Sequence, residues 1–240
     1  VPVLPAEAAL AARARFGAVY SVIFSTCQAL ISMFFLGIGT ATPAARYTKA
    51  ECLEAFQNSD WFVRLDARSH LVARTVLQRD NGIEARHLAV DSLAEVFRID
   101  PDTLEKRFLD HAPVLAAQAG ERALANAGLA ARQIDAVVLS TCTGYVCPGL
   151  SGHVIERLGL RADTQAFDLV GQGCAAALPN LQLGQALLAS GACAHVLSIC
   201  VEVSSAATYL DHPPGVLIGP RRAGGGRRAP RVPPPPRARR

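Results

Sequence analysis

One cysteine of this chain stands where a nucleophile could be activated. An apolar run at residues 166–170 is followed by Gly-Gln-Gly-Cys at 171–174 and then by a helix of small residues. A strand that ends in a glycine-bounded bend before a helix lifts a side chain out of the top of a sheet. The helix dipole then favours the thiolate of Cys174, and its backbone N–H can bind an oxyanion. The alternative is a buried structural cysteine, and the Gly-X-Gly bend favours the nucleophile.

The elements that would position this cysteine alternate between strands and helices. Extended segments are expected at residues 34–39, 83–88, 134–142, 164–170 and 194–201. Helices are expected from residue 48 and at 69–79, 102–111, 113–126, 149–158 and 174–189. Thr48 and Glu51 fit a capping box, and Pro113 should begin a new helix. The pattern predicts an α/β layered fold, with a mixed, mostly parallel sheet between helices on both faces.

Two of these segments carry stronger expectations about burial. Residues 134–142 form a continuous apolar run, which suits a strand buried on both faces of a parallel sheet. The helix at 174–189 is nearly all apolar or small, which suits burial on every side. If no second layer covered that helix, we would expect poor solubility and aggregation.

Charge and cysteine content exclude several classes of protein. The chain holds 24 Lys and Arg and 20 Asp and Glu, but eight of the arginines lie in residues 219–240. The remaining residues therefore carry 16 basic and 20 acidic groups, a net charge of −4, which gives no reason to expect nucleic acid. Seven irregularly spaced cysteines predict reduced thiols and a cytoplasmic protein. No metal is predicted, because no second Cys/His pair matches Cys142 and Cys147.

The two ends of the chain differ from its body. Residues 18–38 are a weak candidate for a membrane span, although polar residues interrupt the run, and we expect no membrane association. Met33 is the only methionine, so we interpret residues 1–32 as a non-native or disordered extension upstream of the natural start. Residues 219–240 contain mainly Arg, Pro and Gly, and we expect a disordered tail produced by a frameshift after Ile218. The folded domain is expected at 33–218.

Three motifs together resemble a known family. They are Gly-Ile-Gly-Thr-Ala-Thr-Pro at 37–43, Ser-Thr-Cys-Thr-Gly-Tyr-Val-Cys-Pro-Gly at 140–149, and Gly-Gln-Gly-Cys at 171–174. Their order and spacing resemble a type III polyketide synthase of the chalcone/stilbene synthase-like family, in a bacterial-type form. The resemblance covers about residues 34–218 and implies the N-terminal half of a thiolase fold, with the C-terminal half missing.

The resemblance implies a homodimeric acyltransferase. Such an enzyme loads an acyl group from a CoA thioester onto a cysteine and extends it by decarboxylative condensation with malonyl-CoA. Cys174 matches the family's nucleophile, Cys142 and Thr143 match positions that line the acyl cavity, and Cys147 matches a residue that reaches across the dimer interface. Ordinary packing at a strand end is the alternative for these last three. CoA thioesters would be substrates, and no permanently bound cofactor is implied.

Other family positions match poorly. Arg74 and Arg79 fall near residues that bind the CoA phosphates, although a solvated helix face also explains them. The family's catalytic histidine and asparagine belong to its C-terminal half, and neither His195 nor His212 matches that histidine. Without these partners we expect condensation to be lost. A ketoacyl-carrier-protein synthase III-like enzyme and a non-catalytic remnant remain alternatives.

Overall fold

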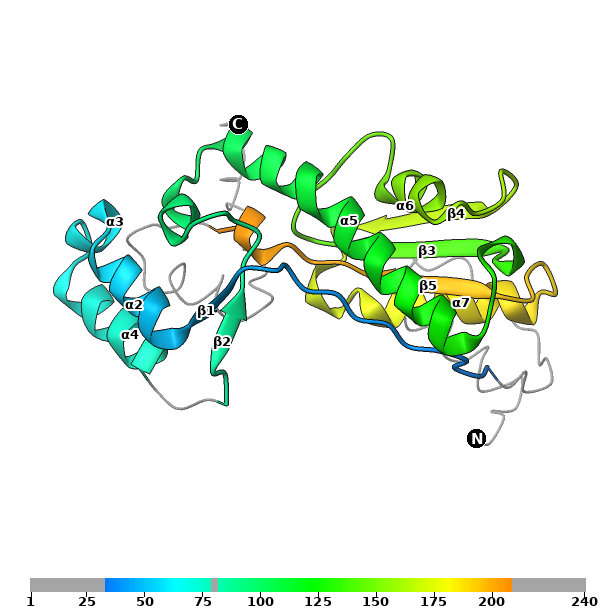
Figure 1. Ribbon diagram of the computed structural model, residues 1–240, viewed down its shortest axis with the longest axis horizontal. Coiled ribbons are helices and arrows are strands. Elements are labelled where there is room, and N and C mark those ends of the chain that lie inside the picture. Colours follow the sequence, from blue (N-terminus) through cyan, green and yellow to red (C-terminus); the bar gives the residue numbers. More distant parts are fainter. Residues whose placement is uncertain (1–32, 79–81, 209–240) are drawn as a thin grey trace, which may run out of the picture. The chain divides into compact units, whose positions relative to one another are not determined.

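The computed structural model describes residues 33–78 and 82–208 of the 240-residue chain (Figure 1). The chain divides into two units, Val1–Ser32 and Met33–Arg240, and the described residues all belong to the second. The expected extension at 1–32 and the expected tail at 219–240 therefore lie outside the described residues. Within the described ranges, no helix combines the length and the hydropathy that a membrane crossing requires.

The first part of the described chain holds three helices that pack around a small apolar cluster. They are α2 (Lys49–Gln57), α3 (Asp60–Val63) and α4 (Ala67–Gln78). The capping box is confirmed: Glu51 N–H donates to Thr48 Oγ1 at 3.2 Å, and Thr48 N–H donates to Glu51 Oε2 at 2.7 Å. Phe56 of α2 and Ala73 of α4 are the buried centre of the cluster.

The main sheet has three strands in the described part of the chain, and all of them are parallel. These are β3 (Ala136–Thr141), β4 (Gln165–Val170) and β5 (Val196–Cys200), in the order β4-β3-β5. β3 is buried along its whole length, as predicted. The mixed sheet that we expected is not found here, because β1 (Arg46–Thr48) and β2 (Ala85–His87) pair antiparallel with each other in a separate sheet.

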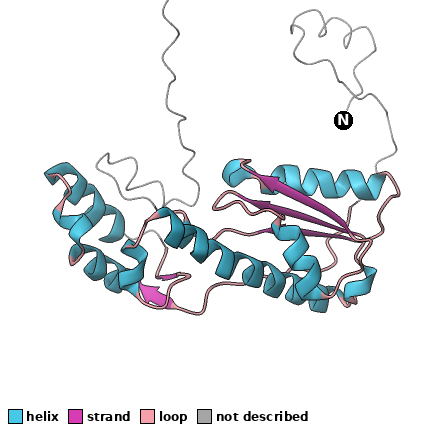
Figure 2. Cartoon of the chain, turned by 90° about the horizontal axis from the view of Figure 1, so that it is seen from above, coloured by secondary structure: helices cyan, strands magenta, loops and turns pink. Residues whose placement is uncertain are grey.

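Helices cover both faces of the main sheet (Figure 2). α5 (Pro101–Ala127) and α6 (Leu150–Leu158) pack on one face, and α7 (Ala177–Ala189) packs on the other. The core on the α5 side includes Phe108 and Leu197. Two short 3₁₀ helices, η1 (Leu93–Phe97) and η2 (Ala131–Gln133), lead into α5 and β3 respectively. This three-layer arrangement confirms the predicted α/β layered class.

α5 is one continuous helix, so the two helices predicted around Pro113 are wrong. Pro113 lies inside the helix and is buried. A proline within a helix removes one backbone hydrogen bond, and here the neighbours Ala112 and Ala116 are also buried in the main core. The apolar contacts of this stretch outweigh the lost hydrogen bond. The predicted helix end near residue 126 agrees with the structure, since α5 ends at Ala127 and Gly128 caps it with φ 67°.

Residues 34–39 are not part of a strand, so the strand predicted there is wrong. This segment runs alongside α5 (Figure 1). There Asn126 Nδ2 donates to the Ile38 carbonyl at 2.7 Å. Gly37 and Gly39 pack so closely that a Cβ atom at either position would overlap the α5 backbone. A groove of about 400 Å³ is lined by this segment, α5, α7 and β5. The segment is therefore held by helix contacts instead of a sheet ladder.

α7 is apolar, but burial on every side, as predicted for it, is wrong. Only Asn180 and Gly184 of this helix are buried. Leu178 is 65% exposed, and most other side chains of α7 are partly or fully exposed. The sheet covers one side of the helix. Among the described residues, no element packs on its other, apolar side. Such a surface favours association with other apolar surfaces.

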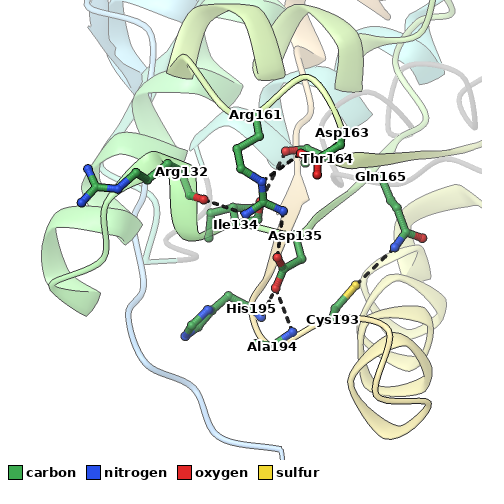
Figure 3. A network of polar contacts seen from close by, with 10 residues as sticks. All are labelled: Arg132, Ile134, Asp135, Arg161, Asp163, Thr164, Gln165, Cys193, Ala194 and His195. Carbon is green, nitrogen blue, oxygen red and sulfur yellow. Dashed lines mark hydrogen bonds and ion pairs between the residues drawn. The ribbon is translucent and has the colours of Figure 1, made fainter.

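A polar network ties together the amino ends of the three main strands (Figure 3). Asp135, just before β3, accepts hydrogen bonds from the N–H groups of Ala194 at 2.8 Å and His195 at 3.0 Å. Arg161 Nη2 donates to Asp135 at 3.0 Å, and Arg161 Nε donates to Asp163 at 2.8 Å. The hydrogen bond from His195, followed by those from Ala194 and Arg161, lowers the pKa of Asp135 against the opposing effect of burial.

Replacing Asp135 by alanine should lower the free energy of unfolding by about 2 kcal/mol at neutral pH, because charged hydrogen bonds to it are lost. The pKa of Asp135 is lower in the folded than in the unfolded chain. Its contribution is therefore present above the unfolded pKa and disappears as pH falls through the folded pKa. Urea denaturation should show that the variant and the wild type converge at acid pH. Asp163→Ala is the control and should change little, because that carboxylate is 76% exposed.

Candidate active site

The glycine-bounded bend after β4 places Cys174 at the carboxyl edge of the sheet. Gly171 has φ 77° and Gly173 has φ 71°. Both values lie in the left-handed region, which residues with a Cβ atom rarely adopt. The predicted Gly-X-Gly bend is therefore confirmed. Cys174 itself lies in the 3₁₀ turn η3 (Gly173–Ala175), and α7 begins only at Ala177. The prediction that the helix starts at the cysteine is wrong.

A short-range hydrogen bond explains this difference. Ala176 N–H donates to the Gly173 carbonyl at 3.1 Å, which closes a 3₁₀ turn before the α-helical pattern starts. Asn180 N–H then donates to the Ala176 carbonyl at 3.0 Å, the first bond of α-helical spacing. Cys174 remains close to the amino end of α7, which is the positive end of that helix.

Cys142 and Cys174 meet where β3 and β4 end. Thr141 and Val170 are paired in the parallel register, so the chain leaves both strands at the same level. The two Sγ atoms are 4.0 Å apart, and both cysteines are exposed. The structure thus brings together the expected nucleophile and one expected acyl-cavity residue.

Glu202 joins this group, and the sequence analysis did not identify it as a site residue. Cys142 N–H donates to Glu202 Oε1 at 2.9 Å and to Oε2 at 3.2 Å. Thr143, another expected cavity residue, accepts at Oγ1 a hydrogen bond from Val203 N–H at 3.0 Å. A carboxylate just beyond the carboxyl end of β5 was the available signal, because the carboxyl ends of parallel strands share one edge.

The surroundings keep the Cys142 side chain protonated. Although the residue is exposed, partial desolvation of the thiol by neighbouring atoms is the largest effect, followed by the hydrogen bond and negative charge of Glu202 and by the contact with Cys174. Together they raise the pKa of Cys142 to about 12. At neutral pH Cys142 is therefore a neutral thiol beside the expected nucleophile.

Replacing Glu202 by glutamine should lower the pKa of Cys142 toward its ordinary value of 9.0, because the negative charge is removed while the partial desolvation of the thiol remains. The measurement is the rate of iodoacetamide alkylation at Cys142, followed by peptide mass spectrometry between about pH 7 and 10. The alkylation rate of the wild type should rise with pH over this whole range. The variant should react faster at each pH, and its rate should begin to level off at the upper end. Glu156→Gln, an exposed change on α6, should leave the profile unaltered. An identical profile for wild type and Glu202→Gln would remove Glu202 from this site.

Cys147 makes no contact with Cys142 or Cys174 that the described part of the structure shows. It is exposed, in the loop between β3 and α6, and no hydrogen bond there links it to Cys142 or Cys174. The far end of this loop is fixed, because Ser151 donates through its N–H to Asp168 Oδ1 at 3.1 Å and through its hydroxyl to Asp168 Oδ2. A Cβ atom at Gly149 would overlap the same carboxylate.

The expected CoA-binding arginines are not joined to the cysteine pair. Arg74 is exposed on α4, and its guanidinium carbon lies 5.9 Å from the ring centroid of Phe62. α4 packs on α2, within the first helical group. Arg79 lies outside the described residues. A role for either arginine in phosphate binding stays a prediction.

His195, which was not expected to serve this site, lies away from the cysteine pair. His195 belongs to the network before β5, at the amino ends of the strands (Figure 3), whereas Cys174 follows the carboxyl end of β4. His212 lies outside the described residues. In the part of the chain that the structure describes, no group of three or more His, Cys, Asp or Glu is arranged to hold a metal ion.

This geometry agrees with a match to a known family. Residues 41–221 match the family model described as FAE1/Type III polyketide synthase-like protein. The chain belongs to this family. The matched region of this type III polyketide synthase-like chain contains Cys142, Cys174 and Glu202, and the match confirms the resemblance proposed from the three motifs.

Two curated polyketide synthases are similar to part of this chain. An alpha-pyrone synthesis polyketide synthase-like Pks18 of Mycobacterium tuberculosis is 33% identical over 143 residues, which are 57% of this chain and 36% of the relative. A 3,5-dihydroxyphenylacetyl-CoA synthase of Streptomyces toyocaensis is 30% identical over 182 residues, 73% of this chain and 43% of the relative. The type III polyketide synthase-like chain thus spans less than half the length of either curated relative.

A solved structure establishes the fold. The crystal structure of PKS-I from the brown alga Ectocarpus siliculosus matches with a TM-score of 0.69 and 23% identity, over 77% of this chain and 51% of that chain. The fold of the type III polyketide synthase-like chain is accordingly the layered α/β thiolase-like fold, as expected.

Proposed function

We propose that this chain performs the acyl-loading step of a type III polyketide synthase, with Cys174 as the nucleophile and an acyl-CoA as the donor. One observation carries the proposal: Cys174 is an exposed thiol on a glycine-bounded bend, near the amino end of α7 and at the carboxyl edge of a parallel sheet. Such a position makes a thiol accessible to an acyl donor. Membership of the type III polyketide synthase-like family supports the same role.

In the proposed step the sulfur of Cys174 attacks the carbonyl carbon of the acyl-CoA thioester. The carbon–sulfur bond to CoA breaks, the CoA sulfur takes up the proton that the Cys174 thiol gives up, and the acyl group remains on Cys174 as a new thioester. Backbone N–H groups at the start of α7 lie next to the reacting residue and are suited to the oxyanion of the tetrahedral intermediate.

The neighbouring side chains would shape the space for the acyl group. Cys142, a neutral thiol 4.0 Å from the Cys174 sulfur, presents a weakly polar surface to that space. Thr143 is fixed by its bond to Val203, so its position relative to Cys142 is set. We propose these two residues as contacts of the acyl chain, and Cys147 as a contact of a partner subunit in a homodimer.

Decarboxylative condensation with malonyl-CoA would need more than this group offers. A malonyl-derived carbanion must be stabilised by donors placed at its oxygen. The described side chains around Cys174 are a thiol and a carboxylate, and His195 belongs to the opposite end of the strands. We therefore propose loading as the activity of this chain, and condensation as an activity it lacks. Acyl-CoA and malonyl-CoA remain the substrates implied by the family.

Mass spectrometry of the intact chain tests the loading proposal. The chain is incubated with a series of acyl-CoA thioesters of different length, and the mass gain is mapped to a peptide. One acyl group per chain, located on Cys174 and released by hydroxylamine, is the expected result. Absence of an adduct for every donor, or an adduct on another residue, would reject the proposal. Adding malonyl-CoA to the loaded chain then tests condensation, and extension of the bound acyl group would show that condensation is retained.

A further inference from the structure

The contact between Cys142 and Cys174 has a second consequence, which concerns oxidation. Their Sγ atoms are 4.0 Å apart, and both residues are exposed. A disulfide bond has a sulfur–sulfur length of about 2.05 Å, so the two sulfur atoms must approach by about 2 Å. Rotation of one cysteine side chain about its Cα–Cβ bond moves a sulfur atom over that range.

The backbone around the pair accommodates such an approach. Cys174 is preceded by Gly171 and Gly173, and an added Cβ at either glycine would have no neighbouring atom within 4 Å. Cys142, in contrast, is fixed by the two hydrogen bonds from its N–H to the Glu202 carboxylate. One cysteine thus stands on a glycine-rich turn with free space, and the other is held in place beside it.

Other described thiols have different surroundings. Cys200 accepts a hydrogen bond from Ser140 Oγ at 3.2 Å, on β5. Cys193 is buried and contacts Gln165 Nε2 at 3.7 Å, near the amino ends of the strands. Within the described part of the chain, the thiol–thiol contact that the structure shows is that of Cys142 with Cys174. An oxidant that reaches either member of this pair therefore has a second thiol next to its product.

We propose that Cys142 and Cys174 form an oxidation site, at which hydrogen peroxide converts the two thiols into an intramolecular disulfide. The consequence for acyl loading rests on the proposed function of Cys174, whereas the disulfide itself does not. While the disulfide is present, Cys174 has no free sulfur with which to attack a thioester. A thiol reductant restores both cysteines and, with them, loading.

The chemistry balances in two steps with peroxide as the only oxidant. The Cys174 sulfur attacks one peroxide oxygen, the O–O bond breaks, and the products are a sulfenic acid on Cys174 and one water molecule. The Cys142 sulfur then attacks the sulfenic sulfur, so that the S–S bond forms and the S–O bond breaks. The departing hydroxyl group and the Cys142 thiol proton leave as a second water molecule. Overall two thiols are oxidised and one peroxide is reduced to two waters.

Cys142 has a protective role in this scheme. A sulfenic acid without a neighbouring thiol is oxidised further to sulfinic acid, which thiol reductants do not reverse. Because Cys142 lies within reach, the disulfide stops the oxidation of Cys174 at a reversible stage. The Cys142→Ser variant should therefore lose reversibility while remaining sensitive to peroxide.

The test uses the full chain, treated with increasing hydrogen peroxide and analysed by peptide mapping without reduction. The wild type should give a peptide pair linked through Cys142 and Cys174, with a mass lower by about 2 Da for the two hydrogens lost. Dithiothreitol should reverse the change. Cys142→Ser should instead gain about 32 Da at Cys174, the two oxygens of a sulfinic acid, which dithiothreitol does not remove. Cys200→Ser, a control at an exposed thiol outside the pair, should form the same link as the wild type.

The outcomes separate this proposal from the loading proposal. Sulfinic acid on wild-type Cys174 without any linked peptide, a link to Cys147 instead, or no reaction of the pair with peroxide would each overturn it, even if acyl-CoA loads Cys174 normally. A linked peptide in a chain that no acyl-CoA loads would support the oxidation site and reject the proposed function. If both hold, peroxide should abolish loading and dithiothreitol should restore it, and prior loading should block the disulfide.

Discussion

Replacing Cys174 by alanine is expected to remove the acyl adduct that forms when the chain is incubated with acyl-CoA. The rate of loading should fall by about 10³-fold or more, because the neighbouring Cys142 thiol is held protonated and a lost nucleophile is not replaced by binding alone. The bend itself should survive, since Gly171 and Gly173 set its backbone conformation. Time-resolved mass spectrometry of the intact chain gives both the rate and the extent of loading.

The control for this prediction is Cys200→Ser, which removes another exposed thiol from the end of β5. Its loading should equal that of the wild type within about twofold, because its hydrogen bond is with Ser140 and not with the cysteine pair. Cys174→Ser offers a second comparison, since a hydroxyl keeps the shape of the side chain but is a much weaker nucleophile. An undiminished adduct in either Cys174 variant would mean that another residue carries the acyl group.

Local sequence rules sufficed for the bend that carries Cys174. Glycines at 171 and 173 predicted a backbone that only glycine adopts readily, and both have positive φ angles. The strand before the bend and the helix after it were also placed correctly by their apolar patterns. The start of α7 was misplaced, because the choice between a 3₁₀ turn and an α-helical turn depends on a single hydrogen bond, from Ala176 to Gly173.

Errors in the fold arose where tertiary contacts decide the outcome. Pro113 was expected to separate two helices, but its burial among the core residues of α5 keeps that helix continuous. Residues 34–39 have the composition of a strand, yet the segment packs along α5, where Asn126 donates to the Ile38 carbonyl. Local propensity describes which secondary structures a segment can adopt on its own, and tertiary packing determines which of them it adopts in the fold.

The candidate site could be predicted only in part for a related reason. Cys142 and Glu202 are 60 residues apart in the chain, and their contact depends on the register of β3 against β5. Period and composition do not specify that register, because a slip of one residue would turn every side chain to the other face of the sheet. Once the register is known, the meeting of the two residues follows from the shared carboxyl edge of parallel strands.

Replacing Asn180 by alanine should cause the largest loss of stability, about 3 kcal/mol, because this amide is fully buried between α7 and the sheet. Its Nδ2 donates to the carbonyls of Val138 at 3.1 Å and Ile199 at 3.0 Å, and its Oδ1 accepts from Ser198 Oγ at 2.6 Å. The amide thus binds β3 and β5 to the helix that follows the nucleophile. Removing it takes one hydrogen-bond partner from each of those groups and opens a cavity.

Urea denaturation at neutral pH is the measurement, with the midpoint expected to fall while the slope m stays constant. Gln185→Ala is the matched control, because it removes an exposed amide from the same helix and should change stability by less than about 0.5 kcal/mol. Asn180→Asp should destabilise at least as strongly as the alanine variant, since a buried carboxylate cannot donate to the two carbonyls and carries a charge. A loss as small as that of the control would show that the amide contributes no more than an exposed residue, and that packing alone holds α7 on the sheet.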